Sequence, residues 1–132
     1  MGKNPKHHPN ILIAEDDPAI RDLMVLVIES EDHWKPTKVH CGEHALEAWD
    51  KVEFDVILMD IRLSGMDGIE TTRRIREQEK RSGRKPTPII AFTAIPEENT
   101  RKECTDAEID DFIYKPFRIE TVIDTIYRHL PD

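Results

Sequence analysis

The sequence predicts an α/β domain with a five-stranded parallel sheet and helices on both faces. Short apolar runs rich in β-branched residues recur along the chain, and amphipathic stretches separate them. Such alternation is typical of parallel sheets with right-handed crossovers. The 132 residues fit one domain and leave no room for a second core. We expect residues 1–9 to be a flexible tail and residues 10–132 to be the domain.

The first two strands and helices are expected before residue 52. Residues 11–14 are an apolar run, and Asp17 and Pro18 then supply a helix N-cap and a first helical residue. Residues 37–40 are a weaker strand candidate, followed by a short helix over 42–51. The side chains expected on the inner faces of the two helices are Ile20, Leu23, Met24, Val27, Ile28, Ala45, Leu46 and Trp49.

The remaining elements follow the same alternation. Residues 54–59 are nearly all apolar, as expected for a strand that is covered on both faces. A turn at residues 66–68 leads into a long charged helix that ends near Gly83, and residues 88–93 form the fourth strand. Residues 112–114 are a short fifth strand. The last helix is expected to turn one apolar side inward: Ile119, Val122, Ile123, Ile126 and Leu130.

The helix predicted over residues 97–107 differs from the others because Cys104 and Ala107 are almost its only apolar residues. Helices in proteins owe most of their stability to an apolar face that packs on the core. We therefore expect this helix to be weakly held. A solvated surface helix and a movable element are both compatible with that pattern.

Composition excludes several classes of function. A net charge of -8 argues against non-specific binding to nucleic acid, which requires a basic surface. No apolar run approaches the length of a membrane span. Cys41 and Cys104 lie far apart in the sequence and suggest a reducing compartment rather than a disulfide framework. These features predict a cytoplasmic domain.

Polar residues gather at the carboxyl ends of the predicted strands, where ligands bind in open α/β sheets. They are Glu15, Asp16, Asp17, Asp60, Thr93 and Lys115. Clustered carboxylates repel one another unless a cation lies between them, and Mg²⁺ prefers carboxylate, water and phosphate oxygens. A carboxylate can attack phosphorus to give an acyl phosphate, and Lys115 and the Thr93 hydroxyl could meet the phosphoryl oxygens.

Simpler roles compete for some of these residues. Asp17 is better explained as a helix N-cap. Taken alone, Glu15 and Asp16 could equally be solvent-facing turn residues. Asp60 is harder to explain in this way, because it follows four apolar residues and an unpaired carboxylate there would be costly.

Four segments of the chain closely resemble the receiver domains of two-component response regulators and hybrid sensor kinases. They are residues 11–18, 55–68, 88–94 and 110–117, in the order and spacing of that family. The resemblance runs from about residue 10 to about residue 130. It implies the flavodoxin-like, or CheY-like, fold with strand order 2-1-3-4-5.

The resemblance implies a metal-assisted phosphoacceptor site. Asp60 corresponds to the residue that is phosphorylated. Mg²⁺ or Mn²⁺ would be held by Glu15, Asp16, Asp60 and the backbone carbonyl of Arg62, with Glu15 acting through water.

Further residues correspond to the family's phosphoryl contacts and switch. Thr93 and Lys115 match the residues that contact the phosphoryl oxygens. Thr93 and Phe112 match the switch pair, and the bond between Lys115 and Pro116 is expected to be cis.

The resemblance also implies a signalling domain rather than an enzyme, one that assists its own phosphorylation and dephosphorylation. The phosphoryl group would come from a phosphohistidine on a histidine kinase or a histidine phosphotransfer protein. The switched surface would comprise the fourth helix, fifth strand and fifth helix. We expect no direct contact with nucleic acid and no membrane span. The oligomeric state stays open, with a weak dimer on phosphorylation as one option. The polar stretch over 77–85 resembles receivers at the ends of hybrid kinases and favours a phosphorelay.

Two positions depart from the family pattern. Ser64 replaces the usual proline after the phosphorylated strand, which predicts a looser loop. Glu108 and Ile109 replace a common Gly-Ala pair after the fourth helix, which removes a preferred C-cap.

Other functions were compared with this one. A dehalogenase-type, Mg²⁺-dependent aspartyl-phosphate phosphatase requires a second Asp where this chain has Arg62, and an FMN phosphate would be repelled by the acidic residues after the first strand. A degenerate receiver that serves only as an interaction module would not need the intact acidic set. His40, Cys41 and His44 suggest a transition-metal site, but they offer only three good ligands.

Overall fold

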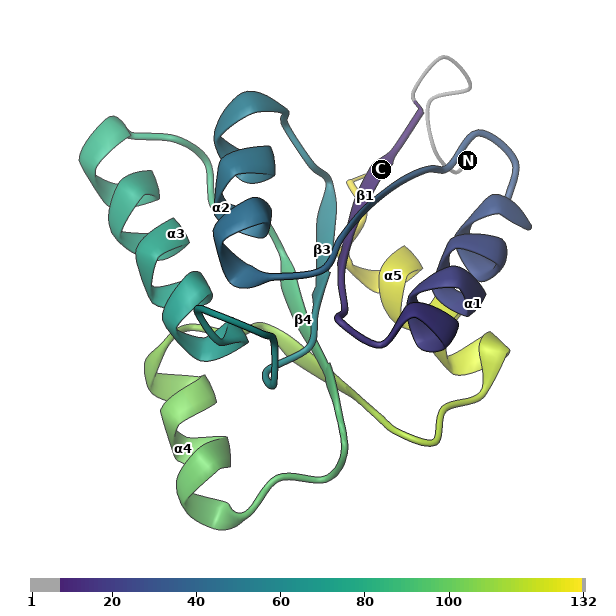
Figure 1. The fold of residues 1–132 in the computed structure, drawn as a ribbon. Helices are drawn as coiled ribbons and strands as arrows, with labels where there is room; N and C mark the ends of the chain where they lie inside the picture. Colours follow the sequence, from purple (N-terminus) through teal and green to yellow (C-terminus); the bar gives the residue numbers. More distant parts are fainter. Residues whose placement is uncertain (1–7, 132) are drawn as a thin grey trace.

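The computed structural model describes residues 8–131, which form a five-stranded parallel sheet with helices on both faces (Figure 1). The strand order is β2-β1-β3-β4-β5, which confirms the predicted topology. The predicted tail lies largely outside the described residues. Of its described part, Pro9 is buried, and its carbonyl accepts a hydrogen bond of 2.8 Å from the backbone N–H of Lys35.

Strands and helices alternate along the whole described chain. Their bounds are β1 (Asn10–Ala14), α1 (Pro18–Glu29), β2 (Lys35–Val39), α2 (Gly42–Lys51), β3 (Val56–Met59), α3 (Gly68–Ser82), β4 (Ile89–Thr93), α4 (Glu98–Asp106), β5 (Asp111–Tyr114) and α5 (Ile119–His129). β2 begins two residues earlier than predicted and contains Pro36. Because β2 is an edge strand, a proline there removes no hydrogen bond from the centre of the sheet.

Two helical layers cover the sheet (Figure 1). α1 and α5 lie on one face, over a core that includes Ile13, Leu58 and Phe92. α2 and α3 lie on the other, over a core that includes Leu12, Trp49 and Ile57. Neighbouring residues of β1 and β3 point to opposite faces, so these central strands are apolar on both sides.

The prediction that Leu23 and Ile119 belong to the core is wrong. Leu23 in α1 is 42% exposed and Ile119 in α5 is 51% exposed. Each helix packs through a narrower stripe than the sequence suggests, formed in α1 by Met24, Val27 and Ile28. Leu23 and Ile119 lie beside these stripes, so they leave apolar surface on the outside of the domain.

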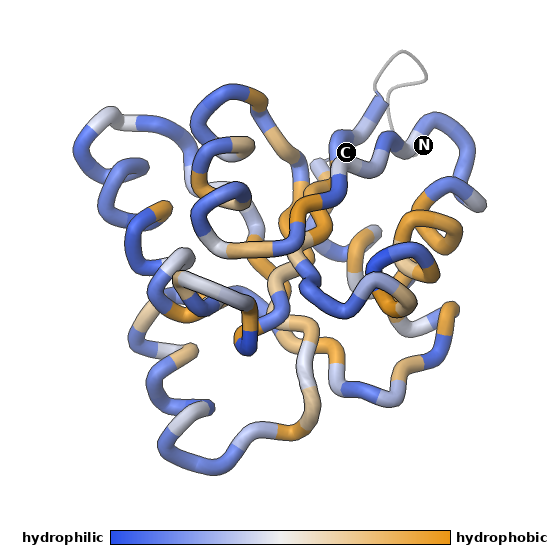
Figure 2. The backbone as a smooth tube through the Cα atoms, in the orientation of Figure 1, coloured by the Kyte–Doolittle hydropathy of each residue, from blue (hydrophilic) through white to orange (hydrophobic). Residues whose placement is uncertain are grey.

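α4 is weakly anchored, as predicted. Cys104 is the buried residue of this helix, and Ala107 directly after it is also buried. Figure 2 shows α4 as mainly hydrophilic, in contrast to the strands at the centre of the domain. Glu108 follows with a φ of 69°, so a non-glycine residue takes the left-handed conformation that the usual glycine would favour. Its carboxylate lies 2.6 Å from the ammonium of Lys80, an exposed pair.

None of the helices within residues 8–131 combines the length and apolar character needed to cross a membrane.

Candidate phosphoacceptor site

The predicted site residues meet at the carboxyl edge of the sheet because the strand register brings their backbones together. Asp60 directly follows β3, and its N–H donates to the carbonyl of Ala14 at the end of β1 over 3.0 Å. Lys115 directly follows β5, and its N–H donates to the carbonyl of Thr93 at the end of β4 over 2.8 Å. Lys115 thereby contacts Glu15, which lies 100 positions earlier in the sequence.

Three carboxylates form a compact cluster at this edge. One oxygen each from Glu15, Asp16 and Asp60 lies within 4.8 Å of the others. Glu15 is 1% exposed and Asp60 is 4% exposed, while Asp16 is half-buried. Carboxylates this close repel one another, and burial removes the water that would screen them.

Lys115 supplies the opposing charge. Its Nζ lies 3.0 Å from Oε1 of Glu15 and 3.2 Å from Oδ2 of Asp60. Burial raises the pKa of Glu15 above 4.5, because the loss of hydration outweighs the hydrogen bond from Lys115. Burial alone would lower the pKa of Lys115, but the bond to Glu15 and the charge of Asp60 outweigh it and raise that pKa above 10.5. The ammonium is therefore fully charged at neutral pH.

Backbone groups orient the two buried carboxylates. The N–H of Arg62 donates to Oδ1 of Asp60 over 2.9 Å, and the N–H of Asp17 donates to Oε2 of Glu15 over 3.1 Å. The side chain of Arg62 is exposed. Asp17 instead caps α1 by accepting from the N–H of Ala19 over 2.9 Å, as predicted. Glu15 is buried, which excludes the solvent-facing alternative for that residue.

Ser64 has a contact that sequence reasoning missed. Its hydroxyl donates to Oδ2 of Asp16 over 3.0 Å, and its backbone forms an isolated parallel bridge with Cys41. Both oxygens of Glu43 accept from the N–H of Met66, over 3.1 and 3.2 Å. The loop after β3 is thus tied both to the acidic cluster and to α2. The loss of proline predicts a looser loop, and these polar contacts are anchors that the prediction did not include.

The donor set fits a hard divalent cation. The carboxylates of Glu15, Asp16 and Asp60 are oxygen ligands of the kind that Mg²⁺ prefers, and Asp16 is open to water. Lys115 is the one cation that bonds to these carboxylates among the described contacts. A divalent ion would balance the remaining negative charge.

The predicted switch residues lie on the two strands farthest from β2. Thr93 is 2% exposed at the end of β4, opposite Tyr114 in the register with β5. Phe112 is half-buried and stacks on Tyr114, with ring centroids 5.7 Å apart. Arg101 of α4 lies over the Phe112 ring at 5.1 Å and hydrogen-bonds to the hydroxyl of Tyr114.

The peptide bond between Lys115 and Pro116 is cis.

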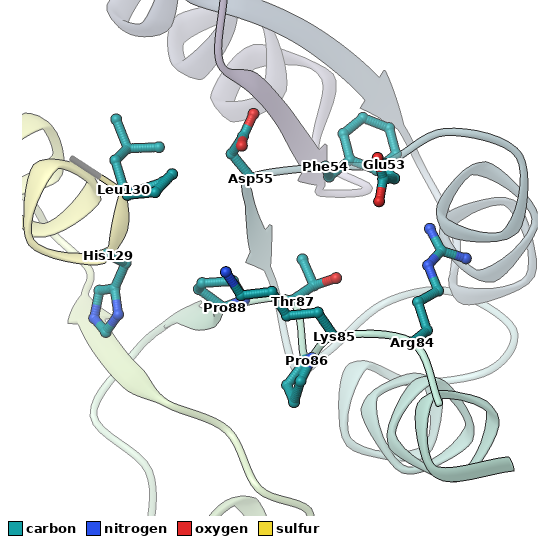
Figure 3. Close-up of a pocket in the computed structure, with 11 residues that line it drawn as sticks. Glu53, Phe54, Asp55, Arg84, Lys85, Pro86, Thr87, Pro88, His129 and Leu130 are labelled. Atoms are coloured by element: carbon teal, nitrogen blue, oxygen red, sulfur yellow. The ribbon is translucent and has the colours of Figure 1, made fainter. Parts of the chain in front are cut away.

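A separate cavity of about 290 Å³ lies at the opposite, amino ends of the strands (Figure 3). It is lined by residues that precede β3 and β4 and by the end of α5, including Asp55, Thr87, Pro88 and His129. Its lining carries charges of both signs and includes none of the predicted site residues. The acidic cluster therefore lies at the other end of the strands, apart from this cavity.

Comparison with known proteins identifies the family. The family model for the response regulator receiver domain matches residues 11–127. This chain belongs to the response regulator receiver domain family. This receiver domain is 36% identical over 113 residues to the transcriptional regulatory protein ResD of Bacillus subtilis. It is 33% identical over 108 residues to the sensor histidine kinase GacS of Pseudomonas protegens.

The relatives are longer proteins. The alignments cover 86% of this receiver domain and 44% of ResD, and 82% of it and 12% of GacS. The chain therefore spans less than half the length of these two relatives. Matching domains occur both in transcriptional regulators and in a sensor kinase.

Solved structures share the whole fold. The receiver domain of the sensor histidine kinase PA1611 from Pseudomonas aeruginosa, solved with a magnesium ion in its active-site cleft, has a TM-score of 0.82 and 33% identity, covering 93% of this domain and 98% of that chain. The chemotaxis protein CheY4 of Vibrio cholerae has a TM-score of 0.85 and 27% identity, covering 94% of this domain and all of that chain. The CheY-like fold predicted from the sequence is confirmed.

Proposed function

We propose that this receiver domain accepts a phosphoryl group on Asp60 from the phosphohistidine of a histidine kinase or a histidine phosphotransfer protein. One observation carries the proposal. The Asp60 carboxylate is buried at the carboxyl edge of the sheet, held at Oδ1 by the Arg62 N–H and paired at Oδ2 with Lys115. A purely structural carboxylate would not need two further acidic groups beside it.

The cluster supports a metal-dependent transfer. Glu15, Asp16, Asp60 and the backbone carbonyl of Arg62 would hold Mg²⁺ or Mn²⁺, as the carboxylate oxygens fit such an ion. The PA1611 receiver domain, 33% identical, holds magnesium in its cleft. When bound, the ion supplies positive charge that balances the carboxylates and the incoming phosphoryl oxygens.

The chain's own residues carry the transfer itself. A carboxylate oxygen of Asp60 forms the new bond to phosphorus as the bond between phosphorus and the donor imidazole nitrogen breaks. The electron pair of that bond returns to the nitrogen, so the donor leaves as a histidine. Lys115, which pairs with Asp60 before transfer, bonds instead to a phosphoryl oxygen.

The proposed output is a shift of α4 and β5 together with α5. The Thr93 hydroxyl moves to donate to a phosphoryl oxygen, which vacates space that Phe112 can enter. Because α4 buries little apolar surface, a modest difference in contact energy would change its position. Thr93→Ala should uncouple the acidic cluster from α4.

The relatives support the partner class. Segments similar to this domain occur in a sensor histidine kinase and in transcriptional regulators. A cytoplasmic location fits the two free cysteines. The domain would act as a phosphoacceptor within two-component or phosphorelay signalling, not as an independent enzyme.

A labelling experiment tests the proposal. With a small phosphodonor such as acetyl phosphate and Mg²⁺, the protein should gain one phosphoryl group that hot hydroxylamine releases, and none when a chelator removes the metal. Asp60→Asn should not be labelled. Asp17→Asn, which keeps an N-cap beside the cluster, should be labelled like the parent protein. Equal labelling of Asp60→Asn would overturn the assignment, and no labelling of the parent protein would favour an interaction module.

A further inference from the structure

A second cluster of metal-binding side chains lies outside the acidic site. His40 follows β2, Cys41 is the N-cap residue of α2, and His44 lies in the first turn of that helix. One ligand atom from each lies within 4.8 Å of the others. The two imidazole rings are 5.0 Å apart between centroids. Both histidines are exposed and Cys41 is half-buried, so an ion could reach them from solvent.

We propose that His40, Cys41 and His44 bind a transition-metal ion of the zinc type, with water in the fourth position. Imidazole nitrogen and thiolate sulfur suit zinc, whereas magnesium prefers oxygen. Three protein ligands with one open position are a recurrent zinc arrangement. The proton of the Cys41 thiol leaves to solvent as the sulfur binds the ion.

The local fold holds the ligands together. His40 and His44 are separated by three residues, a spacing found in zinc sites. Cys41 has extended backbone, with φ of -148° and ψ of 165°, and its side chain does not cap the helix. A Cβ on Gly42 would lie 2.0 Å from the carbonyl oxygen of Met66, so the turn packs tightly on the loop after β3. The Cys41 thiol therefore lies on a turn whose backbone is held by packing against the loop after β3.

The neighbouring Glu43 carboxylate keeps its hydrogen bonds from the Met66 N–H when the thiol is ionised. The carboxylate of Glu43 accepts hydrogen bonds from backbone N–H groups and from the Cys41 thiol. The bonds from the N–H of Met66 do not involve the thiol. Loss of the thiol proton therefore leaves Glu43 bonded to the loop.

The cluster is connected to the acidic site through two contacts. The backbone of Cys41 bridges that of Ser64, and the Ser64 hydroxyl bonds to Asp16. An ion that fixes the turn would also restrain Ser64 and hence Asp16. We expect occupancy to tighten Mg²⁺ binding about fivefold, an expectation that rests on the proposed function.

Cobalt titration tests the site. In reducing buffer with saturating Mg²⁺, Co²⁺ should give a thiolate-to-cobalt charge-transfer absorption at one equivalent. Cys41→Ser should lose the absorption, and His44→Ala should weaken Co²⁺ binding at least about tenfold. An unchanged absorption in Cys41→Ser, or none in the parent protein, would overturn the proposal.

Two control variants exclude other ligands. His8 and His33 also have ring centroids 5.0 Å apart, but no cysteine is near either in the sequence. Cys104 is the second thiol and is fully buried. His33→Ala and Cys104→Ser should keep the cobalt absorption of the parent protein. Loss of it in either variant would contradict the assignment to the turn.

A second titration tests the connection. Mg²⁺ affinity is measured with and without one equivalent of Zn²⁺, in the parent protein and in Ser64→Ala. We expect zinc to tighten Mg²⁺ binding in the parent protein and to have no effect in Ser64→Ala. Equal Mg²⁺ affinity with and without bound zinc would overturn the connection. Absence of Mg²⁺ binding under both conditions would instead contradict the proposed function.

Discussion

The hydroxyl of Ser64 donates a hydrogen bond to Oδ2 of Asp16 over 3.0 Å. The two residues belong to different loops, one after β3 and one after β1. Their bond fixes the most exposed carboxylate of the acidic cluster. The proline that the family usually has at this position could not donate such a bond.

Ser64→Ala should therefore weaken Mg²⁺ binding. Hydrogen bonds to a metal-ligating carboxylate orient it, and their loss costs about tenfold or more in affinity. Isothermal titration calorimetry with Mg²⁺ measures the change. Ser82→Ala, which removes an exposed hydroxyl at the end of α3, is the matched control. Unchanged affinity in Ser64→Ala would mean that this bond does not position Asp16.

Arg101 should restrain α4 in the unphosphorylated domain, because it contacts both Phe112 and Tyr114. An exposed cation–aromatic contact contributes about 0.5–1 kcal/mol. Arg101→Ala should thus raise amide exchange in α4 about two- to fivefold without a phosphoryl mimic. Hydrogen exchange followed by NMR reports each amide, with Lys102→Ala as the control. If the amides of α4 exchanged at the same rates in Arg101→Ala as in the parent protein, Arg101 would not hold the helix.

The phosphorylated form should persist, because the side chains beside the site are poor at orienting water. Ile95 is 75% exposed two residues after Thr93, and Arg62 is also exposed. Replacing Ile95 with Asn should speed loss of phosphate by roughly tenfold, below the full effect of a general base. Ile95→Leu should decay at the parent rate. Release of inorganic phosphate measures the decay. Decay of Ile95→Asn that is equal to or slower than that of the parent protein would contradict a role of Ile95 in slowing phosphate loss.

An ion pair between β5 and α5 should make stability depend on pH in acid. Oδ2 of Asp111 lies 2.9 Å from Nε2 of His129. Burial raises the pKa of Asp111, but the bonds from His129 and from the N–H of Phe112 outweigh it and hold that pKa below 3.8. Its contribution is therefore present above pH 3.8 and is lost as pH falls through the folded pKa.

Asp111→Asn checks this dependence. The difference in unfolding free energy between parent and variant should shrink as pH falls below 3.8, with the exposed Asp124→Asn as the matched control. Urea unfolding at a series of pH values measures both. A difference that stays constant into acid would exclude a stabilising charge on Asp111.

The sequence predicted the elements that have strong periodicity and failed where packing decides. The buried runs of β1, β3 and β4 and the helix start at Asp17 carry their own local signals. The start of β2 was predicted two residues too late, because a proline such as Pro36 is tolerated in an edge strand but not in a central one. Whether a strand lies at the edge depends on the topology of the whole sheet, which no local pattern gives. Leu23 shares the helical period of the core yet lies outside it, since the stripe that packs is narrower than the apolar face.

The sequence predicted those residues of the candidate site that lie at the ends of strands. Asp60 and Lys115 could be paired in advance because parallel strands bring their carboxyl ends to one edge. Ser64, Glu43 and Arg101 could not, because their contacts depend on loop paths and rotamers that no local pattern specifies. Glu108 is similar: the sequence predicted that it replaces the usual glycine, and only the structure shows that it takes the left-handed backbone conformation itself.

Trapping the acyl phosphate by borohydride tests the central claim most directly. Reduction of a phosphorylated aspartate yields homoserine, which tandem mass spectrometry locates in the chain. After reaction with acetyl phosphate and Mg²⁺, homoserine should be found at position 60 and at no other aspartate. Homoserine at Asp16, or its absence from position 60 in protein that has gained a phosphoryl group, would contradict the account.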